Sequence, residues 1–229
     1  MAKRKTYIKS TDKNKPWNKK RGRSKYKKET EAMRKTFLIV CEGQTEALYF
    51  KAIPVRTADV RTVNLEGQSK IQLVNCTEEL SKEEGYDEIW CVFDMDVSRG
   101  EDQFRDFDNA ISKAYSLKFK VAYSNDAFEL WFYLHYHYTD IAHLRFFYYE
   151  KLSALWQINY EKTGKNYCFS TGIFRKLQKD KRASLEEAVE RAESLFQMQR
   201  TRIYHEQNPV TLVYQLVTSL QKECDKEYF

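Results

Sequence analysis

Short apolar runs alternate with longer amphipathic segments through the first half of the chain. The runs contain many β-branched and aromatic residues and are too short for helices, so they predict buried strands. The predicted strands are 35–41, 60–66, 87–94 and 118–124. The predicted helices between them are 45–53, 69–85 and 101–116. Strands separated by helices of this length predict an α/β fold, with a parallel sheet of about four strands and flanking helices.

Capping residues mark the ends of two of these helices. Thr45 is a candidate N-cap of the first helix, and Pro54 follows its end. Ser69 is a candidate N-cap of the second helix, and Gly85 is a candidate C′ residue. Both helices therefore begin directly after the turns that follow a predicted strand.

The second half of the chain shows helical periodicity without a clear strand after Asp126. The predicted helices here are 127–138, 185–199 and 209–224, the last introduced by Asn208 and Pro209. We therefore expect three regions. They are a basic flexible arm at 1–34, an α/β domain at 35–125, and a helical C-terminal part at 126–229 packed on that domain.

Composition favours a folded cytoplasmic protein. Of the 229 residues 42% are hydrophobic, enough to bury a substantial core. No apolar stretch approaches the ~20 residues of a membrane span, and the N-terminus lacks an apolar signal region. The five cysteines form no CxxC pair, which is typical of reduced thiols in the cytoplasm.

Charge is distributed unevenly along the chain. Residues 1–28 hold 13 Lys and Arg and one Asp, a net charge of +12, so with +6 overall the remaining 201 residues carry −6. Basic side chains of this arm, including Lys19, Lys20, Arg21 and Arg23, are candidates for binding nucleic-acid phosphates. The alternative is a solvated tail with no partner.

Four acidic residues follow two of the predicted strands. Glu42 ends the first strand in FLIVCEGQTE, and Glu46 lies in the first turn of the next helix. Asp94 and Asp96 end the third strand in VFDMDV. The carboxyl ends of parallel strands form the rim where ligands bind, so the four carboxylates can gather there.

A divalent cation would relieve the repulsion among these carboxylates. Mg²⁺, or Mn²⁺ in its place, prefers oxygen ligands and retains waters and substrate phosphates in its shell. The predicted chemistry is metal-assisted attack of water on a phosphodiester. A single DxD is a weak signal because acids at strand ends are often solvated, whereas the two acidic motifs in this order are stronger. Gly43 would let the backbone turn sharply or approach a phosphate.

The chain resembles the RloB-like family of bacterial proteins. The segments that carry the resemblance are CEGQTEALYF, WCVFDMDV, SNDAFELWFYLHY and NPVTLVYQLV, within residues 35–222. The resemblance implies a Toprim-like domain, as in topoisomerases, primases and OLD-type nucleases. It matches Glu42, Glu46, Asp94 and Asp96 to the metal-binding acids. It also implies an ATPase partner of AAA or ABC type and a role in antiphage defence or abortive infection.

The segment SNDAFELW contributes further candidates on the same rim. Glu129 is a candidate catalytic residue that would support the metal site, and Ser124 and Asn125 are candidates for binding phosphate or a substrate edge. The alternative is that Ser124 or Asp126 caps the following helix while the apolar residues pack. The family usually has Pro at the position of Asp126, so a different local turn is expected.

Three further groups have simpler interpretations. His135 and His137 would lie about 200° apart around a helix, so they cannot chelate one ion there. The aromatic run 144–152 could stack on bases, although core packing is favoured. The basic residues Lys165, Lys176, Lys179, Lys181 and Arg182 could contact a nucleic-acid backbone or simply be solvated.

The leading hypothesis is a metal-dependent nuclease acting on RNA, including tRNA, or on DNA. The first alternative is a non-catalytic module that binds nucleic acid or a partner protein through the same rim. The second alternative is a nucleotidyl-transfer enzyme, for which the sequence shows no nucleotide pocket. Uptake of Mg²⁺ distinguishes the first two, and consumption of nucleoside triphosphates would identify the third.

Overall fold

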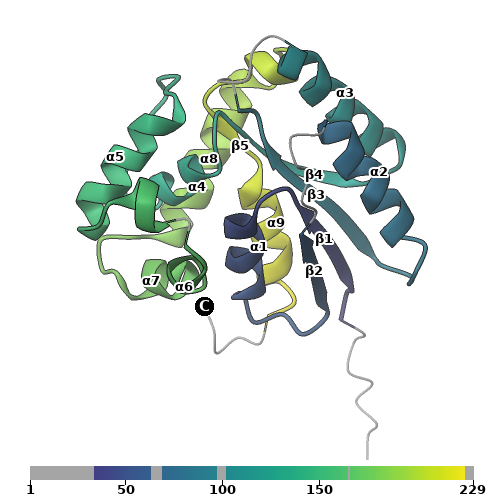
Figure 1. Ribbon diagram of the computed structural model, residues 1–229, viewed down its shortest axis with the longest axis horizontal. Coiled ribbons are helices and arrows are strands. Elements are labelled where there is room, and N and C mark those ends of the chain that lie inside the picture. Colours follow the sequence, from purple (N-terminus) through teal and green to yellow (C-terminus); the bar gives the residue numbers. More distant parts are fainter. Residues whose placement is uncertain (1–33, 63–68, 97–101, 165, 225–229) are drawn as a thin grey trace, which may run out of the picture. The chain divides into compact units, whose positions relative to one another are not determined.

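The computed structural model describes residues 34–62, 69–96, 102–164 and 166–224, shown in Figure 1. These residues belong to one compact unit that begins at Arg34. The candidate phosphate-binding residues Lys19, Lys20, Arg21 and Arg23 lie outside the described residues. The fold is therefore built from the region in which the sequence predicts alternating strands and helices.

One sheet with the strand order β2-β1-β3-β4-β5 lies at the centre of this unit. Its strands are β1 (Phe37–Cys41), β2 (Ala58–Thr62), β3 (Glu88–Asp94), β4 (Lys120–Asn125) and β5 (Val210–Thr211). The first four strands are parallel, and β5 runs antiparallel beside β4. The predicted α/β fold is confirmed, with one strand more than the sequence indicated.

The apolar run of β1 is explained by its position. All five residues of β1 are buried, and the strand pairs with β2 on one side and β3 on the other. A parallel strand that is covered on both faces has no solvent side, so its sequence is continuously apolar instead of alternating. The first polar residue after the run, Glu42, therefore marks the edge of the sheet.

Helices cover both faces of the sheet. The connecting helices are α1 (Gln44–Lys51), α2 (Lys70–Leu80) and α3 (Asp102–Ser116), and α9 (Val213–Gln221) lies near the end of the chain. In Figure 1, α2 and α3 lie side by side on one face, and α1 and α9 lie on the other. The chain moves from β1 to β2 in one direction and then crosses to β3 and β4 in the other. The point where the strand order reverses is thus between β1 and β3, where ligands bind in open α/β sheets.

The N-terminus of α2 is capped by a residue distant in sequence. Ser69 occupies the predicted N-cap position, but its side chain makes no capping hydrogen bond. The carboxylate of Asp106 on α3 instead accepts hydrogen bonds from the backbone N–H of Lys70 at 2.5 Å and of Ile71 at 3.4 Å. This contact joins the two helices on that face and fixes where α2 begins.

The C-terminal part is mostly helical, as predicted. Its helices are α4 (Glu129–Leu134), α5 (Arg145–Trp156), the π-helix η4 (Tyr160–Gly164), α6 (Tyr167–Ser170), α7 (Ile173–Lys179), α8 (Leu185–Gln199) and the 3₁₀-helix η5 (Tyr204–Glu206). The predicted helix 185–199 is confirmed.

The predicted helix 127–138 is wrong in length, because α4 ends at Leu134. Tertiary contacts satisfy the carbonyl groups at this end. The Leu134 carbonyl accepts a hydrogen bond from Arg191 of α8, and the His135 carbonyl accepts one from the N–H of Ser184. Side chains and backbone from another helix thus replace the next helical turn.

The predicted helix 209–224 and the expected absence of strands after Asp126 also need correction. Val210 and Thr211 form β5, and α9 begins only at Val213. Thr211 pairs with Ser124 of β4, and the N–H of Leu212 donates a 2.8 Å hydrogen bond to the Tyr123 carbonyl. The edge of β4 offers backbone groups that this segment satisfies. The C-terminal part therefore contributes a strand and a helix to the sheet layers.

Aromatic side chains join the helical part to the α/β part. Trp131 of α4 is fully buried and donates a 2.9 Å hydrogen bond to the hydroxyl of Tyr49 on α1. The Tyr49 ring also packs against Phe128, Phe132 and Phe174. Such large buried rings explain the high aromatic content.

None of the helices in the described residues is long and apolar enough to cross a membrane.

Candidate functional site

Two adjacent parallel strands bring the acidic motifs together. Cys41 of β1 pairs with Val92 of β3, and the N–H of Glu42 donates a 2.9 Å hydrogen bond to the Val92 carbonyl. Asp94 is the last residue of β3, two positions further on. Glu42 and Asp94 thus emerge from neighbouring strands at the same edge of the sheet, where the strand order reverses.

Three of the predicted acids line one small pocket at this edge. Glu46 of α1, Asp94 of β3 and Glu129 of α4 surround a cavity of about 210 Å³, together with the backbone turn at Gly43. These residues come from three elements that are far apart in sequence. The fold therefore brings into one cavity a set of oxygen donors that sequence order alone only suggests.

The surroundings of Glu46 strongly perturb its carboxyl group. Its Oε2 atom is buried and accepts no hydrogen bond from any described residue. Desolvation, followed by the charges of Asp94, Glu129 and Glu42, raises the pKa of Glu46 to about 8. A carboxyl group in this state binds a proton at neutral pH unless a cation takes the place of the proton.

Gly43 makes room for the Glu46 carboxylate. A Cβ atom at Gly43 would collide with the Oε2 atom of Glu46. The backbone at Gly43 is extended (φ −111°, ψ 158°), a conformation open to any residue. The backbone does bend at Gly43, between β1 and α1, but the bend needs no glycine-only conformation. The glycine instead leaves space for the side chain of Glu46, which folds back over it.

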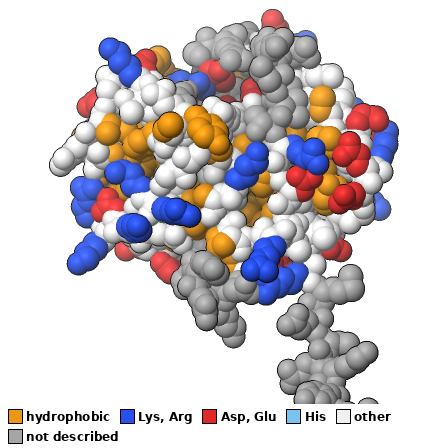
Figure 2. Space-filling view, turned by 60° about the horizontal axis from the view of Figure 1, so that its bottom comes forward, with side chains coloured by type: hydrophobic (Ala, Val, Ile, Leu, Met, Phe, Trp, Pro, Cys, Tyr) orange, Lys and Arg blue, Asp and Glu red, His pale blue; other side chains and the backbone are white. Residues whose placement is uncertain are grey.

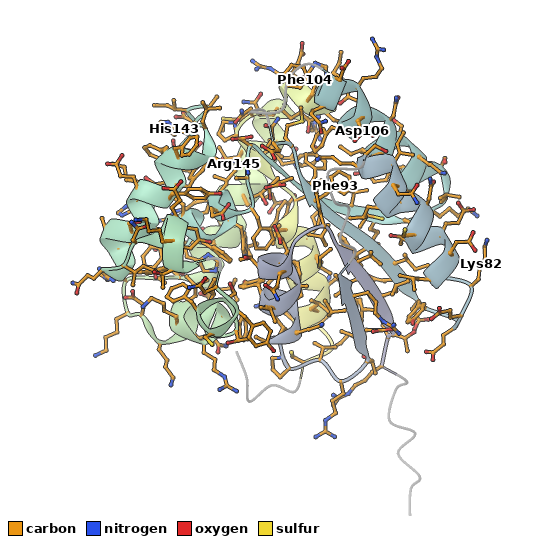
Figure 3. The ribbon with its side chains drawn as sticks, viewed as in Figure 1. Lys82, Phe93, Phe104, Asp106, His143 and Arg145 are labelled. Carbon is orange, nitrogen blue, oxygen red and sulfur yellow. The ribbon has the colours of Figure 1, made fainter. Side chains whose placement is uncertain are left out.

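A partly buried arginine pairs with the DxD motif. The Nη2 atom of Arg145 lies 3.0 Å from Asp96 Oδ1 and 3.6 Å from Asp94 Oδ2. Desolvation raises the pKa of Asp94, although the charges of Arg145 and Lys70 oppose this effect. Figure 3 shows Arg145 at the start of α5, where this helix meets the carboxyl ends of the strands.

A buried lysine lies on the other side of the acids. Lys70, the first residue of α2, is 1% exposed, and its Nζ atom is 3.6 Å from Glu42 Oε2. The site thus contains two positively charged side chains, Lys70 and Arg145, and tertiary structure holds both beside the acids. Both residues begin a helix, where the helix dipole disfavours positive charge. This unfavourable position is a signal that could have identified Lys70 and Arg145 from the sequence.

Glu129 is buried and held by a tyrosine that sequence reasoning missed. Its side chain is 5% exposed, and its Oε1 atom accepts a 3.2 Å hydrogen bond from the hydroxyl of Tyr160 in η4. The structure therefore places Glu129 on the pocket wall, as expected for a residue that supports the acids. No local sequence signal links Tyr160 to the site.

The polar residues of the SNDAFELW segment are buried. The Ser124 hydroxyl is hydrogen-bonded to that of Thr211 at 2.8 Å, and the Asn125 amide donates to the His205 carbonyl at 2.9 Å. Ser124 and Asn125 are 1% and 0% exposed. This burial favours packing over the predicted contact with nucleic acid.

Asp126 caps a helix, but not the one that the sequence predicted. Its Oδ2 atom accepts a 2.9 Å hydrogen bond from the N–H of Arg145 at the start of α5. The Asn125–Asp126 peptide bond is cis. The hydrogen bond from the Arg145 N–H to Asp126 fixes the start of α5, and with it the place from which the Arg145 side chain extends.

The histidines lie in different environments. His135 is buried and hydrogen-bonded through Nδ1 to the Trp131 carbonyl, and burial lowers its pKa to about 4. His137 is exposed, and the His143 ring stacks on Phe147 at 3.6 Å. Each ring thus has its own packing or solvent environment.

The aromatic run 144–152 is only partly buried. Tyr148 and Leu152 are fully buried, as the packing interpretation expects, whereas Leu144 and Phe146 are 56% and 61% exposed. These two exposed side chains flank Arg145 in sequence. Phe146 lines a separate pocket with Tyr149 and Ile158.

The basic residues near α7 form separate contacts. Lys176 lies over the Trp156 ring, and Arg182 forms an ion pair with Asp180. Lys165 lies outside the described residues. On the face that Figure 2 shows, Lys and Arg side chains are spread among apolar and neutral surface, and acidic side chains gather at the right.

The carboxylate oxygens of the pocket fit a hard divalent cation whose coordination shell is completed by water molecules. Glu46, Asp94 and Glu129 supply carboxylate oxygens to one pocket, and the buried Oε2 atom of Glu46 accepts no hydrogen bond from the described residues. In the described part of the chain, no three His, Cys, Asp or Glu side chains are grouped closely enough to hold a metal ion by themselves. Mg²⁺ commonly binds through one or two carboxylates and keeps several waters, so this arrangement is compatible with it.

Comparison with known proteins identifies the family. No curated protein and no solved structure matches the chain significantly. The model of the family described as "RloB-like protein" matches residues 37–220, which include the sheet, the acidic pocket and most of the helical part. This match extends over far more than half of the 229 residues, and the chain therefore belongs to the RloB-like family.

Proposed function

We propose that this protein is a Mg²⁺-dependent nuclease that hydrolyses phosphodiester bonds of RNA or DNA. The observation that carries the proposal is the single pocket lined by Glu46, Asp94 and Glu129, with the pKa of Glu46 raised to about 8. Strongly perturbed carboxyl groups that share one cavity are typical of functional sites. Glu42 and Asp96 would complete the donor set at the rim.

Each group has a role in this proposal. Glu42, Glu46, Asp94 and Asp96 are the acids from which the metal ion would take its one or two direct carboxylate ligands, with waters completing its shell. Glu129 would orient these acids. The bound ion would supply the Lewis acidity that activates water and stabilises charge on the phosphodiester oxygens. Lys70 and Arg145 bring positive charge to the same edge, where the substrate's phosphates would lie. The aromatic core beneath α4 would exclude water from behind the pocket.

The proposed biological role rests on the family. The resemblance to RloB-like proteins implies a Toprim-like domain. It also implies an ATPase partner, encoded beside the nuclease, that controls its activity. We therefore propose that the protein acts as an effector of antiphage defence or abortive infection in the cytoplasm. A tRNA is one candidate target within the RNA class.

Glu46→Gln tests this function most directly, because it should remove a metal-binding oxygen without disturbing the fold. Glutamine resembles the protonated carboxyl group that Glu46 adopts without metal, so the fold should persist while a metal-binding oxygen is lost. Purified protein should degrade RNA or DNA with Mg²⁺ or Mn²⁺, and should lose this activity with a chelator or with Glu46→Gln. Equal cleavage by Glu46→Gln and Asp94→Asn would contradict the proposal.

Expression in cells gives a second test with a matched control. Wild-type protein should slow growth and fragment RNA or DNA, and Asp94→Asn should do neither. Glu79→Gln is a suitable control because Glu79 is exposed and forms an ion pair with Lys82 in the turn after α2. If the Asp94→Asn variant is still toxic, the growth inhibition does not come from the proposed nuclease chemistry.

A non-catalytic binding module is the second candidate, and one observation favours it. Arg145 already pairs with Asp94 and Asp96, and Lys70 already pairs with Glu42, without a metal ion. A module of this kind would bind nucleic acid or a partner protein but take up no Mg²⁺. Isothermal titration calorimetry with MgCl₂ on the full chain separates the two functions, since only the nuclease requires measurable binding.

A further inference from the structure

Arg145 is held against the candidate metal-binding acids by three carboxylates. Its Nη2 atom lies 3.0 Å from Asp96 Oδ1 and 3.6 Å from Asp94 Oδ2, and its Nε atom lies 3.9 Å from Asp126 Oδ2. The side chain is 17% exposed. The N–H of Arg145 is fixed to Asp126, so the residue cannot move away without unwinding the start of α5.

The pairing of Arg145 is electrostatic and leaves its donors unused. Nε and Nη2 are buried and make no hydrogen bond with the described residues. Arg182, by contrast, donates from Nε and Nη2 to both oxygens of Asp180, at 3.0 and 2.7 Å. Buried donors that lie near carboxylates but make no well-directed hydrogen bond leave part of their bonding capacity unsatisfied, and a guanidinium fork matches the oxygens of a phosphate. The Arg145 guanidinium therefore has unused binding capacity directed into the acid site.

The same two aspartates cannot serve Arg145 and a divalent cation equally well. Asp94 and Asp96 are the oxygen donors that the proposed function assigns to the metal. A cation that binds them displaces the guanidinium charge from its present partners. The guanidinium is then free to bind an anion close to that cation.

We propose that Arg145 is the phosphate-binding residue of this site and exchanges partners when metal binds. Without metal it neutralises Asp94 and Asp96. With metal it binds a phosphate of the nucleic-acid substrate. This inference rests on the proposed nuclease function.

Metal binding in the absence of substrate tests the first half of the exchange. Titration of MgCl₂ or MnCl₂ into the full chain should give tighter binding for Arg145→Gln than for wild type, by roughly tenfold, because a competing charge is gone. Arg145→Lys keeps the charge and should stay close to wild type. Arg182→Gln is the matched control and should leave metal affinity unchanged.

Nucleic-acid binding tests the second half. The probes are single-stranded RNA and DNA oligonucleotides with phosphorothioate linkages, measured with CaCl₂ so that binding is followed without relying on cleavage. Arg145→Gln should bind the preferred oligonucleotide roughly tenfold more weakly than wild type. Arg145→Lys should also bind more weakly because it lacks the planar guanidinium fork.

The proposal predicts that Arg145→Gln raises the affinity for metal and lowers the affinity for the oligonucleotide. An arginine with a purely structural role would not give these opposite changes. If wild type and Arg145→Gln bind metal equally, the exchange is wrong while the nuclease proposal stands. If wild type binds no metal, both the partner exchange of Arg145 and the nuclease proposal are wrong. If Arg145→Gln does not fold, as judged by thermal unfolding, Arg145→Lys decides the matter: oligonucleotide affinity equal to wild type overturns the phosphate-binding role.

Discussion

The buried Lys70 at the start of α2 forms an ion pair with the partly buried Glu42, the residue after β1. The Nζ atom of Lys70 lies 3.6 Å from Glu42 Oε2, and the lysine is only 1% exposed. A buried lysine remains charged only where carboxylates compensate for its loss of hydration. The candidate metal site is therefore also a site on which the stability of the metal-free protein depends.

Glu42→Gln should destabilise the metal-free protein by roughly 2 kcal/mol at neutral pH, because Lys70 loses its nearest counter-charge. Lys70→Met in the same chain should restore part of this loss, with a coupling energy of about 1–2 kcal/mol. Urea denaturation of wild type, both single variants and the double variant measures the coupling. Strictly additive free energies would show that the pair contributes nothing.

Glu46→Gln should keep or raise the free energy of unfolding of the metal-free protein. The pKa of Glu46 is raised to about 8 from 4.5, so the stability that its proton contributes is fully present below 4.5 and is lost as pH rises through about 8. Above that pH the variant should exceed wild type by on the order of 2 kcal/mol. Chemical denaturation from pH 5 to 9 in a chelator checks this difference, and wild type should gain from added Mg²⁺ where the variant does not.

The Glu88 carboxylate should stabilise the fold at neutral pH and lose this effect in acid, whereas the Glu46 carboxyl group stabilises the fold when it is protonated. Burial alone would raise the pKa of Glu88, but hydrogen bonds from Lys120, Lys35, Ser219 and Trp90 outweigh this effect and lower the pKa to about 2. Its contribution is therefore present above 4.5 and is lost as pH falls toward 2. Glu88→Gln should cost on the order of 2 kcal/mol at pH 7 and much less at pH 2.5.

Thermal and denaturant unfolding of the Glu88→Gln variant at these two pH values measures the effect. Glu79→Gln removes an exposed carboxylate that pairs with Lys82, and it should change the stability little at either pH. A loss for Glu88→Gln that does not depend on pH would point to packing instead of charge.

Asp126→Ala should destabilise the protein by about 1 kcal/mol and loosen the start of α5, because the N–H of Arg145 loses its acceptor. Asp126→Asn keeps an oxygen acceptor and should cost less. Hydrogen exchange of the first turn of α5 reports the local effect, and urea denaturation reports the global one. The exposed Asp140 provides the control, since Asp140→Ala should leave exchange in α5 unchanged.

The strands and first helices were predictable because their signals are local. The runs that end in Glu42 and Asp94 are apolar because both faces of their strands are covered. The strand β5 was not predictable in this way, since Val210 and Thr211 adopt extended structure only because β4 offers an unpaired edge. The early end of α4 at Leu134 likewise depends on Arg191, which lies 57 residues away.

The sequence by itself determined the α/β fold, the two acidic motifs and their place at strand ends, because periodicity and strand order carry that information. Only the tertiary structure decided that Glu46, Asp94 and Glu129 share one pocket and that Lys70 and Arg145 balance the acids. The pKa of Glu46 and the pairing of Arg145 depend on desolvation and on distances between residues far apart in the chain. These are quantities that no local pattern contains.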